Sequence, residues 1–128
     1  MLVNTTIQKE AIALLKKLIA TPSFSRQEQQ TGDLIELFFR KRNIMPQRIG
    51  NNIVVRSKHW STAKPTILLN SHHDTVKPAS GYTKDPFNPE VSNGKLYGLG
   101  SNDAGGSLVA LIATFLHLYD QALSLIHI

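Results

Sequence analysis

The stretch TILLNSHHD, residues 66–74, decides how this chain folds. Its first six residues form a mainly apolar run of strand length, which predicts a strand buried on both faces inside an α/β sheet. The strand should open into a loop at His72-His73-Asp74. Because side chains two positions apart in an extended segment lie on one face, we expect Asp74 beside His72. His73 should point the other way, as a neighbour or a substrate contact.

The pair His72 and Asp74 favours a metal site. A single histidine after a strand is more often a hydrogen-bonded structural residue than a metal ligand. A carboxylate on the same face changes this interpretation, because it can accept the second N–H of the imidazole, fix its tautomer and strengthen it as a ligand. The chain has no cysteine, so any metal ion must be held by histidines and carboxylates.

A second motif, GLGSND at residues 98–103, follows about thirty residues later. It places Asp103 after a glycine-rich turn and before a helical pattern, and one carboxylate can bridge two divalent ions. The alternative is an aspartate that caps a helix, which is very common. A phosphate-binding loop is poorly supported because the Lys-Ser/Thr pair is absent, and Asp103 occupies the third glycine position of a dinucleotide-binding fingerprint.

The remaining pattern predicts helices packed on a mixed β-sheet, an α/β fold. Apolar residues at helical spacing predict a first helix that ends at Thr21-Pro22 and a third that begins at residue 103 or 104. Residues 25–28, SRQE, form a capping box that should open a second helix, with its stop near Asn43. The other expected elements are strands at 47–49 and 53–56, an irregular segment at 77–89, and a hairpin at 91–97 around Asn93-Gly94.

Composition excludes several classes of protein. The 128 residues are 41% hydrophobic and 18% charged, which is typical of a globular chain with one modest core. No apolar run reaches membrane-spanning length, so we expect no membrane partner. The net charge is +5, but the basic residues are scattered and their one cluster, at 40–42, suits a helix C-terminus, so we expect no nucleic-acid partner. The lack of cysteine favours a cytoplasmic location.

Three stretches taken in order resemble the M20 family of metallohydrolases, which includes acetylornithine deacetylase, succinyl-diaminopimelate desuccinylase, aminoacylase and related carboxypeptidases. They are residues 68–76, residues 85–87 (DPF) and residues 94–103, and the resemblance extends over residues 5–120. The chain departs from the commonest family pattern at Leu99, where many members have Arg, and at Gly105, where many have Lys. The Gly-Leu-Gly sequence favours the acetylornithine deacetylase branch.

The resemblance implies a role for each site residue. His72 would be the ligand of one zinc ion, Asp74 the catalytic carboxylate that supports it, and Asp103 a ligand that bridges two Zn²⁺ ions, with Co²⁺ as an alternative metal. The peptide bond after Asp103 would be cis. The substrate would be a small N-acyl amino acid, with N-acetylornithine expected first. The alternatives are a desuccinylase, a dipeptidase or carboxypeptidase of the same family, and a non-catalytic member that binds a ligand.

The resemblance also implies that part of the active site lies outside this sequence. The family's general base is a glutamate from a later Glu-Glu pair, and the chain has no glutamate after Glu90. We therefore expect residues 1–122 to be the N-terminal portion of a zinc-peptidase-like catalytic domain, inactive alone. The domain through which the parent would form a homodimer is not encoded here. Residues 123–128, LSLIHI, match the translation of a library-preparation adapter and are expected to be non-native, the alternative being a native amphipathic tail.

Overall fold

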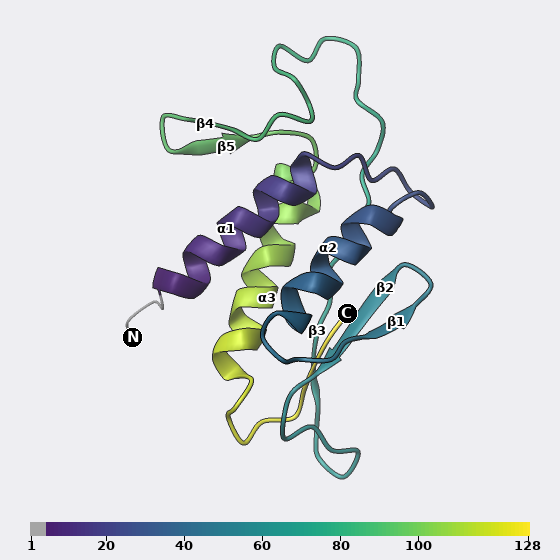
Figure 1. The fold of residues 1–128 in the computed structure, drawn as a ribbon, viewed down its shortest axis with the longest axis vertical. Coiled ribbons are helices and arrows are strands. Elements are labelled where there is room, and N and C mark those ends of the chain that lie inside the picture. The colour runs from purple at the N-terminus through teal and green to yellow at the C-terminus, as the bar shows by residue number, and fades with distance from the viewer. Residues whose placement is uncertain (1–4) are drawn as a thin grey trace.

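The computed structural model describes residues 5–128 and contains three α-helices and six strands in that range. Helices α2 and α3 pack against a four-stranded sheet, and α1 packs across α3 and α2 on the side away from the sheet (Figure 1). The predicted α/β arrangement, with helices on a mixed sheet, is confirmed. The helices are α1 (Thr5–Ile19), α2 (Gln29–Arg40) and α3 (Gly106–Leu118).

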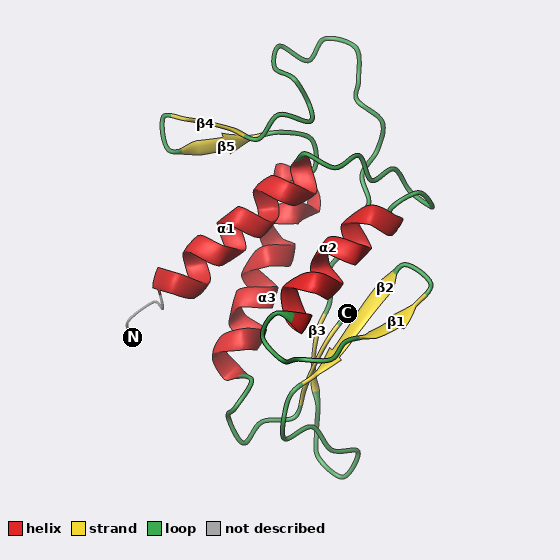
Figure 2. Ribbon diagram, viewed as in Figure 1, coloured by secondary structure: helices red, strands yellow, loops and turns green. Residues whose placement is uncertain are grey.

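The larger sheet has the strand order β1-β2-β6-β3. Its neighbours pair antiparallel except β3 and β6, which are parallel, so the sheet is mixed. A separate two-stranded hairpin, β4–β5, lies beyond the ends of α1 and α3 (Figure 2). The strands are β1 (Gln47–Ile49), β2 (Asn52–Arg56), β3 (Ile67–Leu69), β4 (Glu90–Ser92), β5 (Lys95–Tyr97) and β6 (Leu125–His127).

The hydrophobic core lies where the three helices meet the sheet. Phe39 of α2 and Phe115 of α3 are fully buried and contact each other edge to face, with ring centroids 6.0 Å apart. Such aromatic pairs contribute about 0.5–1.5 kcal/mol beyond their buried area. The core also holds the apolar faces that helical spacing predicted, namely Ala11, Leu14, Leu15, Leu18, Ile35, Leu108 and Ile112.

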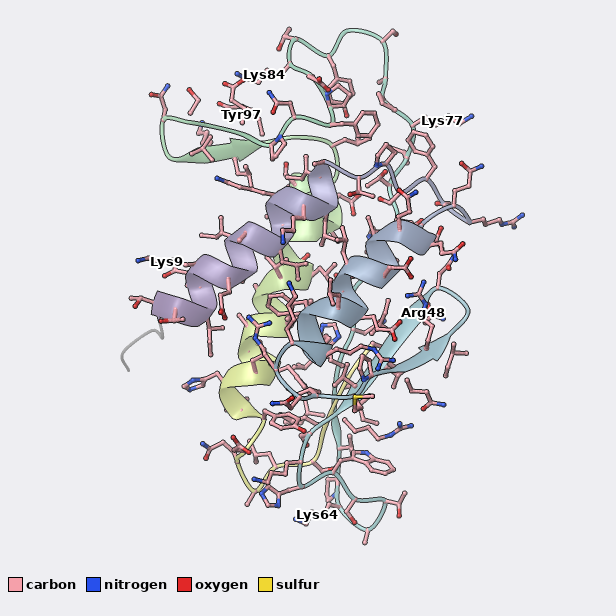
Figure 3. The ribbon with its side chains drawn as sticks, viewed as in Figure 1. Lys9, Arg48, Lys64, Lys77, Lys84 and Tyr97 are labelled. Carbon is pink, nitrogen blue, oxygen red and sulfur yellow. The ribbon has the colours of Figure 1, made fainter. Side chains whose placement is uncertain are left out.

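The predicted hairpin is confirmed, with Asn93 and Gly94 at its turn. Both have positive φ, 51° and 72°, as the type I′ turn of a two-residue hairpin loop requires. Among the described helices, none combines the length and the apolar character that crossing a bilayer requires. The labelled lysines Lys9, Lys64 and Lys77 lie on separate parts of the surface (Figure 3), in keeping with the scattered basic charge of the sequence.

The prediction that residues 66–71 are buried on both faces is wrong. Strand β3 covers only Ile67–Leu69 and lies at the edge of the sheet, and the exposed fractions of Ile67 and Leu68 are 58% and 55%. The helices contact β2 and β6 instead. An apolar run signals a strand that could be buried, but the strand order decides whether a helix layer reaches it.

The predicted capping box at residues 25–28 is also wrong. Helix α2 begins at Gln29, and its cap residue Glu28 makes no side-chain capping hydrogen bond. Arg26 has a positive φ of 71°, which takes the chain out of the geometry of a capping box. The hydroxyl of Ser25 instead donates to the carboxylate of Asp74, 49 residues away. The helix ends at Arg40, and the predicted stop Asn43 adopts a left-handed φ of 58° shortly afterwards.

Residues 125–127 form strand β6, which lies between β2 and β3. Leu125 and His127 are buried, with exposed fractions of 1% and 2%. The ring of His127 lies 6.2 Å from the ring centroids of both Phe39 and Phe115, and neither of its nitrogens has a hydrogen-bond partner. The adapter origin of residues 123–128 stays a prediction about where they come from. Within the fold they occupy an interior strand of the sheet.

Candidate metal centre

The structure brings His72 and Asp103 together. His72 follows the end of β3, and Asp103 lies in the turn Ser101–Gly105 just before α3. The Nε2 atom of His72 is 3.1 Å from Oδ1 of Asp103. Both side chains are open to solvent, with exposed fractions of 51% and 87%. An imidazole nitrogen and a carboxylate that converge at an exposed point are suitable donors for a divalent cation.

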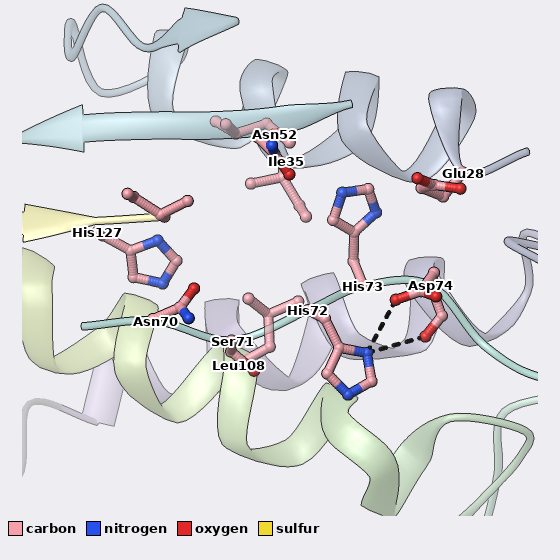
Figure 4. A pocket seen from close by; sticks show the side chains of 12 residues that line it. Glu28, Ile35, Asn52, Asn70, Ser71, His72, His73, Asp74, Leu108 and His127 are labelled. Atoms are coloured by element: carbon pink, nitrogen blue, oxygen red, sulfur yellow. Dashed lines mark hydrogen bonds and ion pairs between the residues drawn. The ribbon is translucent and has the colours of Figure 1, made fainter. Parts of the chain in front are cut away.

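Asp74 holds the other side of the His72 ring. Its Oδ1 and its backbone carbonyl oxygen each lie 3.1 Å from Nδ1 of His72 (Figure 4). With Nδ1 directed at Asp74, Nε2 is the nitrogen that faces Asp103. This is the arrangement in which a carboxylate fixes the orientation of a metal-binding histidine.

The charges of the two aspartates act on His72. Partial burial opposes protonation of the ring, but the hydrogen bond to the Asp74 carbonyl and the charges of Asp74 and Asp103 outweigh it and raise the pKa of His72 above 6.5. The hydroxyl of Ser25 and the nearby His72 hold the pKa of Asp74 below 3.8, against the opposing effect of burial. Asp74 is therefore a carboxylate at neutral pH, as an acceptor for the imidazole must be.

A glycine turn carries Asp103 to this position. Gly98 and Gly100 have φ values of 146° and 76°, a region that residues with a side chain rarely adopt. The amide of Leu99 donates to the carbonyl of Pro86 at 2.7 Å, which fastens the turn to the DPF motif. The peptide bond between Asp103 and Ala104 is cis, as the family resemblance implied.

We expect Gly98→Ala to destabilise the chain by about 3 kcal/mol, through a strained φ and a steric overlap. A Cβ atom at position 98 would lie 2.2 Å from Cγ2 of Ile19, which is buried. Gly81→Ala is the matched control, because Gly81 also has a positive φ, 101°, but a Cβ there meets nothing within 4 Å. Urea unfolding of both variants measures the difference. Equal losses would mean that the contact with Ile19 is unimportant.

His73 points away from the two aspartates, as predicted. Its Nδ1 lies 2.8 Å from the hydroxyl of Thr31 at the start of α2, and its Nε2 lies 3.0 Å from the carbonyl oxygen of Asn51 between β1 and β2. Burial lowers its pKa below 6.5, so the ring is neutral. Because protein groups occupy both ring nitrogens, His73 joins the loop after β3 to α2 and to the β1–β2 hairpin, and the substrate-contact interpretation is not supported.

Ser23 and Phe24, which the sequence did not indicate, support the site. The carbonyl of Ser23 accepts a hydrogen bond from the amide of Thr75 at 2.7 Å, and the ring of Phe24 contacts that of Phe87 edge to face, with centroids 6.3 Å apart. The loop between α1 and α2 thus contacts the segment after His72 and the DPF segment, to which the turn that carries Asp103 is hydrogen-bonded. Only the DPF motif gave any signal of this in the sequence, and it did so through family resemblance.

A cavity of about 300 Å³ opens beside the site. Its wall includes His72, Asp74 and Asp103, together with the exposed side chains of Val76 and Tyr82.

The side chains at this cavity fit part of a metal site. The imidazole of His72 and the carboxylate of Asp103 converge, and the carboxylate of Asp74 orients the imidazole. Over residues 5–128, no group of three or more His, Cys, Asp or Glu side chains could hold a metal ion. A sound zinc site uses three or four protein ligands, so His72 and Asp103 would supply a part of one.

Comparison with known proteins shows which family this chain is similar to. Residues 68–127 match the model of Peptidase family M20/M25/M40, and this range contains all three residues of the candidate site. The chain is thus similar to the M20 family, in agreement with its sequence motifs. Among similar proteins are the succinyl-diaminopimelate desuccinylase of Xylella fastidiosa (strain M23), 29% identical over 120 residues, and the probable succinyl-diaminopimelate desuccinylase of Staphylococcus aureus (strain Mu50), 29% identical over 125 residues. These alignments cover 88% and 92% of the chain but only 31% and 30% of the relatives.

Solved structures share the fold. An M20 family metallo-carboxypeptidase from Sulfolobus solfataricus matches with a TM-score of 0.71 and 22% identity, over 92% of this chain and 30% of its own. Human carnosine dipeptidase 1 matches with a TM-score of 0.69 and 21% identity, over 94% of this chain and 31% of its own. The chain thus spans about a third of the length of the relatives it matches.

Proposed function

We propose that this chain is part of a metal-dependent hydrolase that cleaves the amide bond of an N-acylated amino acid, with His72 and Asp103 as ligands of zinc. The observation that carries the proposal is the 3.1 Å approach of His72 Nε2 to Asp103 Oδ1, because 31 residues separate the two in sequence. The match of residues 68–127 to the M20 family supports it. We also propose a cytoplasmic location and a homodimeric parent protein, in keeping with the composition and the family.

The residues divide the work at the site. When bound, a divalent metal supplies Lewis-acid polarisation of the amide carbonyl and lowers the pKa of water, and Co²⁺ could replace Zn²⁺ in this role. Asp74 accepts the Nδ1–H of His72, which leaves the Nε2 lone pair free to bind the metal. Asp103 presents its carboxylate to the same point. The general base would come from the longer protein, because this chain has no glutamate after Glu90.

The choice of substrate is a finer proposal. The curated relatives are named as succinyl-diaminopimelate desuccinylases, which supports N-succinyl-diaminopimelate. The Gly-Leu-Gly turn at residues 98–100 supports N-acetylornithine, by its resemblance to acetylornithine deacetylases. We propose these two compounds as the candidate substrates, ahead of the dipeptides that related enzymes cleave.

The test uses the longer protein of which we propose this chain to be a part, assayed with both compounds and with a dipeptide. We expect zinc-dependent release of amine from one of the two acylated amino acids, with much slower cleavage of the other. Activity should disappear with a chelator and return with Zn²⁺ or Co²⁺. A protein that binds these compounds without any release of amine would instead be a non-catalytic member of the family.

A further inference from the structure

The hydroxyl of Ser25 forms a hydrogen bond with a carboxylate distant in the sequence and plays no part in capping the nearby helix α2. Ser25 lies in the loop between α1 and α2, where it donates a hydrogen bond to Oδ2 of Asp74. The other oxygen, Oδ1, lies 3.1 Å from Nδ1 of His72. We propose that Ser25 is a positioning residue for the metal centre, which fixes the rotation of the Asp74 carboxylate and through it the tautomer of His72.

The backbone around Ser25 is held in register with the site. The amide of Thr75 donates to the carbonyl of Ser23 at 2.7 Å, and Phe24 and Thr75 form a parallel β-bridge. One turn later the amide of Gln27 donates to the carbonyl of Phe24 at 2.7 Å. Residues 23–25 therefore run beside the segment that carries Asp74. Backbone hydrogen bonds hold Ser25 where its hydroxyl can reach the Asp74 carboxylate.

Two aspartates compete for the single proton of a neutral His72 ring. In one tautomer Asp74 accepts it from Nδ1, where the Asp74 backbone carbonyl also lies 3.1 Å away, and in the other tautomer Asp103 accepts it from Nε2. A metal ion needs the Nε2 lone pair, so only the Nδ1–H tautomer is ready to bind it. By holding Oδ1 of Asp74 toward the ring, Ser25 favours the Nδ1–H tautomer over the alternative.

The contact is placed for orientation rather than for folding. Ser25 is exposed, and the Asp74 side chain is 35% exposed, so water can replace the hydrogen bond at little cost to stability. The same hydroxyl does not cap α2, whose first residue is Gln29. Removing the Ser25 hydroxyl should therefore shift the tautomer ratio of His72 and leave the free energy of unfolding nearly unchanged.

The first experiment is NMR of the His72 ring nitrogens in the metal-free 128-residue chain, at a pH where the ring is neutral. We expect the Nδ1–H tautomer to dominate in the unaltered chain, Ser25→Ala to shift it toward Nε2–H, and Ser25→Thr to restore it. Ser80→Ala is the matched control, since Ser80 is exposed and lies outside residues 23–25. An unchanged tautomer ratio in Ser25→Ala would overturn the inference.

The second experiment measures Zn²⁺ affinity of the same variants, and it rests on the proposed function. Loss of an outer-shell partner typically lowers metal affinity by about 10–100-fold. Ser25 acts one step further out, through Asp74, so we expect a loss near the lower end of that range, about tenfold, for Ser25→Ala. We expect recovery in Ser25→Thr and the same urea midpoint in all variants. If the unaltered chain binds no Zn²⁺, the proposed metal site fails while the tautomer result still decides the role of Ser25. If it binds and Ser25→Ala binds equally well, the positioning role is refuted.

Discussion

His127→Leu is expected to stabilise the 128-residue chain and to remove most of its sensitivity to acid. His127 is 2% exposed between Phe39 and Phe115, and neither ring nitrogen has a hydrogen-bond partner. Leaving a buried polar atom without a partner costs about 1–3 kcal/mol, and leucine removes that cost at neutral pH. Leucine also suits a strand whose side chains pack against the helix layer.

The acid effect follows from the pKa of His127. Burial lowers it from 6.5 to about 4, so the folded chain keeps the ring neutral where the unfolded chain takes up a proton. Stability is therefore complete above about pH 6.5 and is lost as the pH falls toward 4, by about 3 kcal/mol at pH 4. That is a large share of the roughly 5–15 kcal/mol by which small domains are stable.

Urea unfolding between pH 7.5 and pH 4 checks this expectation. The curve of stability against pH should be much flatter in His127→Leu than in the unaltered chain. His59→Gln is the control, because His59 lies exposed in the loop after β2 and should leave the curve unchanged. The other groups with shifted pKa values, His72, His73 and Asp74, would account for the slope that remains. Parallel curves for His127→Leu and the unaltered chain would show that the ring is not buried as described.

Removing either His72 or Asp103 should abolish most Zn²⁺ binding by this chain. Each would supply a direct ligand, so alanine at either position should lower the affinity by more than the roughly 10–100-fold typical of an outer-shell partner. The double variant should bind no more weakly than the single ones, because two ligands of one ion act as a unit. Competition with a chromophoric chelator gives the three affinities.

Asp120→Asn provides the control for this zinc experiment. Asp120 is an exposed carboxylate that pairs with Lys58 at 3.2 Å, far along the chain from the site. Its removal should leave zinc binding unchanged. Additive losses from His72→Ala and Asp103→Ala would mean that the two residues bind separate ions, and full binding by either variant would place the zinc elsewhere.

The elements with local signals could be predicted from the sequence. The helical spacing of apolar residues gave three helices, and Asn93-Gly94 gave the β4–β5 hairpin, because periodicity and turn chemistry are properties of neighbouring residues. The burial of β3 could not be predicted, since the strand order that leaves it at an edge depends on β6. The capping-box prediction was wrong because the hydroxyl of Ser25 bonds to the Asp74 carboxylate, 49 residues away in the sequence, and not to the start of α2.

The candidate site was predictable only in part. The placement of Asp74 beside His72 follows from their spacing in an extended segment. Nothing local indicates that Asp103 lies across from them, and that expectation came from resemblance to the M20 family. The partners of His73, Thr31 and Asn51, come from two other elements and left no pattern in the sequence.

We expect the loop at residues 23–27 to make the two halves of the candidate metal centre open together. Through Ser23 it holds the segment after His72, and through the Phe24–Phe87 contact it holds the segment whose Pro86 carbonyl anchors Leu99. If this loop detaches, the amides of Thr75 and Leu99 lose their protection in one event. Hydrogen exchange at those two positions should therefore report a single opening free energy, although the two residues are 24 positions apart in the sequence.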